Sequence, residues 1–525
     1  MSLRLVRSAG LIGLATMASR VLGLVRDVVL AGAFGAGDRM DAFYVAFRIP
    51  NLVRDLFAEG AMTAAFVPTF TRYLTRHGRE QAWRLGNTVI TALLLVSGAL
   101  VVVGVVASEP LVRLFAAGFA EVPGKLELTV RLTRVMFPFL TLVAIAVAFM
   151  GMLNALRHFF VPALSPAIFN IAVIISVIVL VPVAANLGID PMLAVGVGVL
   201  LGGLGQILLQ WLPLRREGFR LRWLPAIRDP GLREILLLML PGTIGLAAVQ
   251  VNVFVNTVLA AGEGTGAVSW LSYAFRLMYL PIGVFGVSIA TAALPEVSRR
   301  VAEDDGAGVR QTVSSGLRLM LMLNVPATLG LVVLAEPIVA LIFERGAFTG
   351  ADTVAVASAL MFYAPGLVGY SAVKLASPTF YALGDARTPV MISILSVLVN
   401  VVLNVTLVGV MGYRGLALGT AVASVLNGTL LLALLRTRLG GLDGRRVMLA
   451  FVKIFVASTV MALTAWWTEG ALAEAVVGDD TLPRALRVGT AIGAGLLSLA
   501  AMARLLALEE FDAAVAQVLM RLRPR

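Results

Sequence analysis

Long apolar stretches recur along the whole 525-residue chain and restrict its fold more than any other feature. A hydrocarbon core of about 30 Å is crossed by a helix of roughly 20 apolar residues. Fourteen stretches of about this length lie near residues 10–34, 42–70, 87–107, 130–153, 161–184, 191–213, 235–261, 267–294, 316–343, 354–381, 389–410, 414–436, 449–468 and 486–507. Only 14% of the residues are charged, so the sequence predicts an all-α integral membrane protein with fourteen transmembrane helices.

The basic residues between these stretches predict the orientation of the chain in the membrane. Loops on one side hold 24 Arg or Lys residues and loops on the other side hold 6. Because cytoplasmic loops carry the excess of basic residues, both termini are expected in the cytoplasm of a bacterial inner membrane. Insertion alone accounts for the formal charge of +12, so nucleic-acid binding is not expected.

The chain has no cysteine and only two histidines, His77 and His158, in separate polar segments. This excludes disulfides and thiolate metal sites and argues against a histidine-based catalytic or metal centre. No cofactor or metal is expected.

An internal repeat divides the chain. Residues 46–65 and 274–293 are identical at eight of twenty aligned positions, and both begin Ala-Phe-Arg. Further matches at an offset of 227 pair Pro138, Ala155, Leu156 and Pro162 with Pro365, Ala382, Leu383 and Pro389. Matched helices are six spans apart, which predicts two six-helix lobes of the same orientation that bind a substrate between them and rock. The expected domains are 1–214, a cytoplasmic linker 215–234, 235–438, and a terminal helix pair with its tail, 439–525.

Charged residues lie where lipid is expected. The motif Arg-x5-Arg-Asp occurs twice, as Arg20…Arg26-Asp27 and as Arg48…Arg54-Asp55. Each arginine at the bilayer centre costs at least about 2.5 kcal/mol. The candidate substrate-binding residues are Arg20, Arg26, Arg48, Arg54 and Arg276, and the candidate supporting acids are Asp27, Asp41, Asp55 and Glu59.

Several guanidinium groups in one wet cavity suit a phosphate or pyrophosphate, which arginine binds with two parallel hydrogen bonds. Such a cavity would repel cationic drugs. The alternative is that these arginines form salt bridges between helices or extend to the water interface.

A second polar group could hold a monovalent cation. It comprises Asn256, Asn400, Asn404 and Thr420, of which Asn400 and Asn404 share one helix face. Because no carboxylate is among them, amide hydrogen bonding between helices explains them equally well. Lys374 and Glu336 are isolated charges to which the sequence assigns no role.

The linker 215–234 is rich in arginine and contains Phe219, Trp223 and Leu224. This composition is typical of an amphipathic segment that lies on anionic lipid. An ordinary basic cytoplasmic loop would have the same charge.

Two runs, SRVLGLVRDVVLAGAFGAG (19–37) and DAFYVAFRIPNLVRDLFAEGAMTAAFVP (41–68), closely resemble the MurJ (MviN) lipid II flippases of the multidrug/oligosaccharidyl-lipid/polysaccharide exporter superfamily. Residues 269–287 and 375–390 are similar to further family segments. The resemblance implies fourteen helices, with the last two lining a groove for a polyprenyl tail. It places the family's essential cavity arginines on Arg20, Arg26, Arg54 and Arg276, and their acidic partners on Asp27 and Asp41.

Two departures from the family pattern stand out. Some members carry an acid where this chain has Phe275, and some hold sodium with carboxylates where this chain has Asn256 and Asn404. Coupling to the membrane potential is therefore as plausible here as coupling to a monovalent cation.

The resulting hypothesis is a lipid II flippase, not an enzyme, that carries the undecaprenyl-pyrophosphate-linked peptidoglycan precursor to the periplasmic leaflet by alternating access. Its expected partners are lipid II, membrane lipids and other cell-wall synthesis proteins. The rivals are an exporter of another polyprenyl-linked glycan, a multidrug antiporter, and a membrane glycosyltransferase. The outer loops 108–129 and 469–485 are short and hold only scattered acids, which argues against the transferase.

Overall fold

The computed structural model describes residues 3–56, 60–226, 228–283, 287–476, 478, 480–512 and 515. Within these ranges every element of regular secondary structure is a helix, which confirms the all-α prediction. The chain forms two compact units, residues 1–269 with 345–348, and residues 270–344 with 349–525. The predicted lobe and linker boundaries follow the repeat instead, and they stay a prediction.

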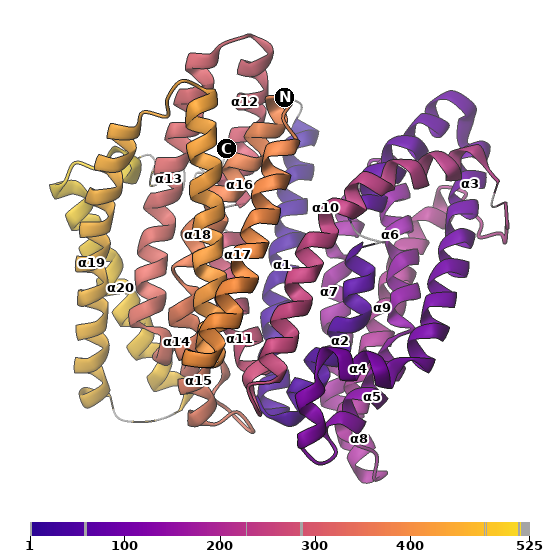
Figure 1. The fold of residues 1–525 in the computed structure, drawn as a ribbon, viewed down its shortest axis with the longest axis horizontal. Coiled ribbons are helices and arrows are strands. Elements are labelled where there is room, and N and C mark those ends of the chain that lie inside the picture. Colours follow the sequence, from indigo (N-terminus) through magenta and orange to yellow (C-terminus); the bar gives the residue numbers. More distant parts are fainter. Residues whose placement is uncertain are drawn as a thin grey trace. The chain divides into compact units, whose positions relative to one another are not determined.

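The first unit contains the helices that precede the midpoint of the chain (Figure 1). These are α1 (Leu3–Phe34), α2 (Asp38–Arg54), α3 (Gly60–Val106), α4 (Ser108–Phe115), the 3₁₀-helix η2 (Ala117–Glu121), α5 (Lys125–Met136), α6 (Phe139–Ala155), α7 (Phe160–Ile175), the π-helical η3 (Ser176–Leu180), α8 (Val181–Asn186), α9 (Pro191–Arg216) and α10 (Pro230–Ala261). Helix α1 packs on α7, α7 and α6 pack on α9, α2 packs on α5, and α3 packs on α6 and α10.

The second unit contains the remaining helices, and α11 begins three residues before it. These are α11 (Ala267–Pro281), α12 (Val287–Ala302), α13 (Gly306–Val333), α14 (Ala335–Phe343), α15 (Gly350–Tyr363), α16 (Gly366–Ala382), α17 (Arg387–Met411), α18 (Tyr413–Arg438), α19 (Gly444–Ala475) and α20 (Thr481–Leu505). Helix α18 packs on α16 and α17, and α19 packs on α13 and α20.

Polar contacts fix the last helix pair to its own unit near both ends of α20. At one end, Arg484 donates to Glu344 at 2.9 Å. At the other, Lys453 donates to the carbonyl of Leu506 at 2.7 Å, and Arg318 pairs with Glu510. Helices α19 and α20 are therefore an integral part of the second unit.

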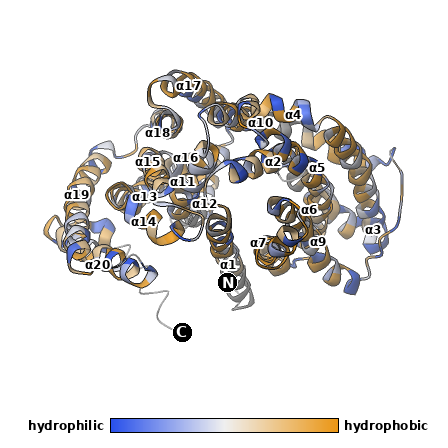
Figure 2. Cartoon of the chain, turned by 90° about the horizontal axis from the view of Figure 1, so that it is seen from below, coloured by the Kyte–Doolittle hydropathy of each residue, from blue (hydrophilic) through white to orange (hydrophobic). Residues whose placement is uncertain are grey.

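The helices present apolar side chains outward, as lipid contact requires. Exposed residues include Val106, Val410 and Leu497, and Figure 2 shows apolar residues along most helices. Nine helices in the described part of the chain are long and apolar enough to cross a membrane, or ten if the bent pair α15–α16 is one span. The chain is thus a multi-pass membrane protein. The count of fourteen spans stays a prediction, since α2 and α11 have only 17 and 15 residues.

The structure differs from the expected spans at 42–70 and 87–107. Helix α2 begins at Asp38 and ends at Arg54, and α3 runs from Gly60 through the arginine-rich stretch that was expected as a loop. The chain changes direction inside α3 at Gly78, whose φ of 82° favours glycine. The flanking Arg, Glu and Gln residues are good helix formers, which explains why this polar stretch is helical.

Residues matched by the repeat occupy equivalent places in the two units. Pro138 and Pro365 precede α6 and α16, which both have 17 residues. The residues that follow these helices, Leu156 and Leu383, have nearly the same backbone angles. The repeat therefore extends from sequence to local structure.

Four residues from the second half of the sequence, 345–348, belong to the first unit. They pack against the end of α1, where the Ala347 amide donates to the Gly32 carbonyl at 2.8 Å. A Cβ on Gly346 would lie 2.2 Å from that carbonyl oxygen, and one on Gly35 would lie 2.5 Å from the Ala347 oxygen. Glycine at both positions is needed for this close approach.

Candidate functional site

Two Arg–Asp pairs with the same geometry form the centre of the candidate site. In α1, Arg26 donates to Asp27 Oδ1 from Nε at 3.0 Å and from Nη2 at 2.7 Å. At the end of α2, Arg54 makes the same two bonds to Asp55 Oδ1 at the same distances. Adjacent residues on a helix do not face each other, so each arginine bends back onto its neighbour. Each pair has a net charge near zero.

The Arg26 pair is largely buried, with side-chain exposures of 14% for Arg26 and 2% for Asp27. Arg26 Nη1 also donates to Asn170 Oδ1 on α7 at 3.1 Å, and Asn170 Nδ2 donates to the Ser19 carbonyl at 3.2 Å. Asn170 thereby holds α1 and the guanidinium in place. The guanidinium carbon lies 5.9 Å from the centre of the Phe169 ring, within cation–π range.

Aromatic stacking connects this pair to α2. The Phe169 ring stacks on Phe47 at 6.1 Å, and Phe47 stacks on Phe43 at 5.8 Å. Phe47 directly precedes Arg48, so one aromatic row joins the environments of Arg26 and Arg48.

Helix α10 supplies polar partners to the charged face of α2. Arg48 Nη1 donates to the buried hydroxyl of Thr257 at 2.9 Å, and Gln250 Nε2 donates to Asp55 Oδ2 at 3.4 Å. Arg48 and Asp55 are seven residues apart, and so are Gln250 and Thr257 on α10. Seven residues span about two helical turns. The order of the contacts shows that the two helices run antiparallel.

The other candidate residues are placed differently. Arg20 is partly exposed, and no hydrogen bond or ion pair joins it to another residue in the described part of the chain. Arg276 is exposed and belongs to α11 in the second unit. Glu59 lies outside the described residues.

Asp41 pairs with a lysine and not with an arginine. Lys125 Nζ lies 2.9 Å from Asp41 Oδ2 and 2.9 Å from Asp38 Oδ1, and it lies 4.2 Å above the Phe119 ring. Asp41 also accepts the Gly266 amide at 2.7 Å and the amide and hydroxyl of Ser269 at 2.9 and 2.7 Å. This buried carboxylate holds residues 266–269, the last of this stretch in the first unit, to α2 and α5.

Three of the four candidate cation ligands form one buried group, named here the amide cluster: Asn400, Asn404 and Thr420. Asn404 donates to Asn400 Oδ1 at 3.2 Å, and Asn400 donates to the Thr420 hydroxyl at 3.4 Å. A Cβ on Gly419 would lie 2.0 Å from Asn404 Oδ1, so the amide packs directly on α18. Asn256 lies on α10, in the first unit. The internal hydrogen bonds suit helix packing, and a cation at this place stays a prediction.

Lys374 and Glu336 are exposed.

Comparison with known proteins gives the family. The family described as "Lipid II flippase MurJ" matches residues 30–483. The chain belongs to the MurJ family. A probable lipid II flippase MurJ of Vibrio cholerae is 36% identical over 441 residues, covering 82% of each chain, and a lipid II flippase MurJ of Burkholderia cenocepacia is 36% identical over 427 residues, covering 81% of this chain and 82% of the relative. This confirms the resemblance seen in the sequence.

Solved structures agree with this family. A MurJ lipid II flippase in an inward closed conformation is 26% identical, with a TM-score of 0.77 over 95% of this chain and 99% of that one. An inward-facing multidrug transporter of the MATE family, 17% identical, shares the fold with a TM-score of 0.68 over 81% of this chain and 96% of that one. Both likenesses agree with the fold that the resemblance implies.

Sequence reasoning missed several partners of the MurJ motif. Lys125, Asn170, Gln250 and Thr257 each contact a candidate residue from another helix. The seven-residue spacing of Gln250 and Thr257 in an apolar helix was a signal that could have identified both.

Proposed function

We propose that the chain carries lipid II, the lipid-linked cell-wall precursor named in the relatives, from the cytoplasmic to the periplasmic leaflet of the bacterial inner membrane. Family membership supports the substrate, because relatives that share a third of its residues over most of their length are named for this lipid. The structural observation that carries the mechanism is the pair of matching Arg–Asp contacts in α1 and α2.

A neutral Arg–Asp pair is suited to exchange its anion. In the absence of cargo, the aspartate offsets the charge of the guanidinium in a low-dielectric region, so the arginine does not remain as an isolated charge. A pyrophosphate offers several oxygens in the geometry that the guanidinium fork prefers. Arg54 is the more exposed member, at 26% against 14% for Arg26, so it is expected to exchange first.

Arg48 supplies a further guanidinium group on α2. It donates to the hydroxyl of Thr257, a neutral group. Arg48 and Arg54 are six residues apart on α2, or about 1.7 helical turns. Both guanidinium groups attract the diphosphate when the cargo binds. The lipid tail remains in the bilayer, and release on the other side returns each arginine to its aspartate.

Alternating access, cytoplasmic termini and coupling to membrane potential or a monovalent cation complete the proposal. The strong excess of basic residues in one set of loops supports the orientation. Contact with other cell-wall synthesis proteins belongs to the same proposal.

Arginine substitutions in cells depleted of their own flippase test this function. Arg26→Ala and Arg54→Ala are each expected to abolish the appearance of lipid II in the outer leaflet, measured by cleavage with an enzyme added from outside. Arg113→Ala is the control, since Arg113 contacts only the exposed Glu109 in the described structure. Immunoblots of membranes establish equal amounts of protein. Normal transport by both site variants would refute the mechanism.

The identity of the cargo has its own test. Native mass spectrometry of the purified protein is expected to show a bound lipid with the mass of lipid II. A bound polyprenyl-linked glycan of another mass, or a cationic drug, would contradict the substrate while leaving the family unaffected.

A further inference from the structure

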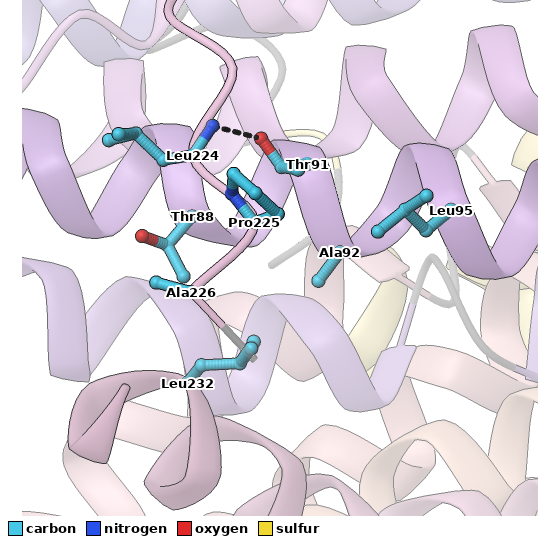
Figure 3. Close-up of a pocket in the computed structure, with 8 residues that line it drawn as sticks. All are labelled: Thr88, Thr91, Ala92, Leu95, Leu224, Pro225, Ala226 and Leu232. Carbon is cyan, nitrogen blue, oxygen red and sulfur yellow. Dashed lines mark hydrogen bonds between the residues drawn. The ribbon is translucent and has the colours of Figure 1, made fainter. Parts of the chain in front are cut away.

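Between α9 and α10, residues 219–226 form no helix, and their backbone is fastened to α3. We name residues 219–226 the strap. The Asn87 side chain donates to the Arg220 carbonyl at 3.0 Å and accepts the Arg222 amide at 2.8 Å. One turn further along α3, the Thr91 hydroxyl accepts the Leu224 amide at 3.1 Å (Figure 3). The path of the strap is thus fixed by α3.

The start of this segment packs against protein. The Phe219 ring is 1% exposed and lies 5.3 Å from the Trp83 ring and 6.0 Å from the Phe149 ring. Glu217, just before the strap, lies 3.0 Å from His158 Nε2 and 3.2 Å from Arg79. The acid and the first aromatic residue of the linker are therefore turned toward protein.

Four consecutive residues of the strap, 220–223, expose apolar and cationic side chains. Leu221 and Trp223 are 57% and 60% exposed. Arg222, which lies between them in the sequence, and Arg220, which precedes Leu221, are exposed as well. The nearest acid on the far side, Asp229, accepts the amides at the start of α10. The exposed run 220–223 thus has an indole and two guanidinium groups with no acid among them.

Position and chemistry together favour one partner, a bilayer rich in anionic lipid. The strap follows the end of α9, a helix long and apolar enough to cross a membrane, so we place it near the level of the membrane surface. Tryptophan prefers the headgroup region, where its ring is apolar and its N–H is hydrated. Each arginine near an anionic surface strengthens binding about fivefold.

We propose that the strap is a binding surface for anionic lipid, with Leu221 and Trp223 in the headgroup region and Arg220 and Arg222 on lipid phosphates. The sequence had suggested Phe219 and Leu224 as further lipid-contacting residues. In the structure Phe219 is buried in protein and Leu224 is half-buried, so Leu221 and Trp223 take this place. The inference is independent of the transported cargo.

Fluorescence quenching in nanodiscs tests the proposal. The full-length protein is reconstituted in phosphatidylcholine with a minority of phosphatidylglycerol, and bromine is placed on the chains of one lipid or the other. The Trp223 signal is the difference between wild type and Trp223→Phe. It is expected to be quenched several-fold more strongly by brominated phosphatidylglycerol than by an equal fraction of brominated phosphatidylcholine.

Two surface variants give the controls. Arg220→Gln with Arg222→Gln is expected to remove the preference for phosphatidylglycerol while Trp223 remains quenched by both lipids. Arg446→Gln, an exposed arginine elsewhere, is expected to leave the preference unchanged.

Equal quenching by the two brominated lipids in the wild type would overturn the proposal. It would also be overturned if Trp223 emits as a water-exposed indole in every lipid mixture, which would point to a protein partner instead. Both outcomes are measurable without any transport activity.

Discussion

Replacing Lys125 with methionine is expected to destabilise the first unit strongly. The Lys125 and Asp41 side chains are 1% and 0% exposed, and their charged atoms lie 2.9 Å apart. The variant would leave the carboxylate buried, with the donors from Gly266 and Ser269 but no cation. Removing one member of a buried ion pair costs about 3–5 kcal/mol.

A double variant separates the charge from the packing. Lys125→Met with Asp41→Asn removes both charges, and the asparagine oxygen can still accept amide hydrogens at the start of α11. Replacing both members of a buried pair by neutral groups is often nearly neutral in free energy. The double variant is therefore expected to recover most of the loss. Arg113→Met, which breaks the exposed pair with Glu109, should cost less than about 1 kcal/mol.

Unfolding in mixed micelles measures these differences. Increasing the fraction of sodium dodecyl sulfate unfolds the purified protein, and the fluorescence of its six tryptophans follows the transition. The expected order of stability is wild type and Arg113→Met highest, the double variant next, and Lys125→Met lowest. A double variant less stable than Lys125→Met would refute the reasoning, because it would mean that the lost contacts, and not the unpaired charge, cause the damage.

Three further predictions concern packing, pH and ions. Gly369→Ala should lower stability by about 1–3 kcal/mol, because its Cβ would lie 2.4 Å from the Ser424 backbone. Gly98→Ala is the control and should not lower stability, because Gly98 has open space around it. Thermal unfolding compares the two variants. The hydrogen bond from His158 lowers the pKa of the Glu217 carboxyl in the folded protein. The contact therefore stabilises the folded protein fully above the ordinary carboxyl pKa, and this stabilisation is lost as the pH falls through the lowered pKa. The stability difference between wild type and Glu217→Gln should therefore shrink below about pH 4.5. Replacing sodium by choline at constant ionic strength should leave unfolding and transport unchanged if the amide cluster only joins helices, and a sodium-dependent shift would contradict that.

Contacts within one helix were predictable from the sequence, and contacts between distant segments were not. The motif places Asp27 and Asp55 directly beside Arg26 and Arg54, and the structure pairs them. Asp41 was taken as an arginine partner, yet Lys125, 84 positions away, is bound to it. Spacing along a chain gives the face of a helix but not the neighbour that this face contacts.

Hydropathy alone was equally limited for the polar parts of the fold. A scan for apolar stretches treats the arginine-rich part of α3 as a loop, although its residues are good helix formers. It also cannot show that the strap is fastened by Asn87, because one amide side chain that binds two backbone groups has no signature in composition.

The glycine contact between α1 and residues 345–348 has a consequence for dividing the protein. A fragment that ends near residue 269 contains every helix of the first unit but lacks the peptide that hydrogen-bonds to Gly32. Such a fragment would expose Gly32 and Gly35 and would leave the Gly32 carbonyl without its hydrogen bond from Ala347. We therefore expect the first half of this duplicated chain to fold fully only when the second half is present, even though each copy of the repeat contains its own set of helices.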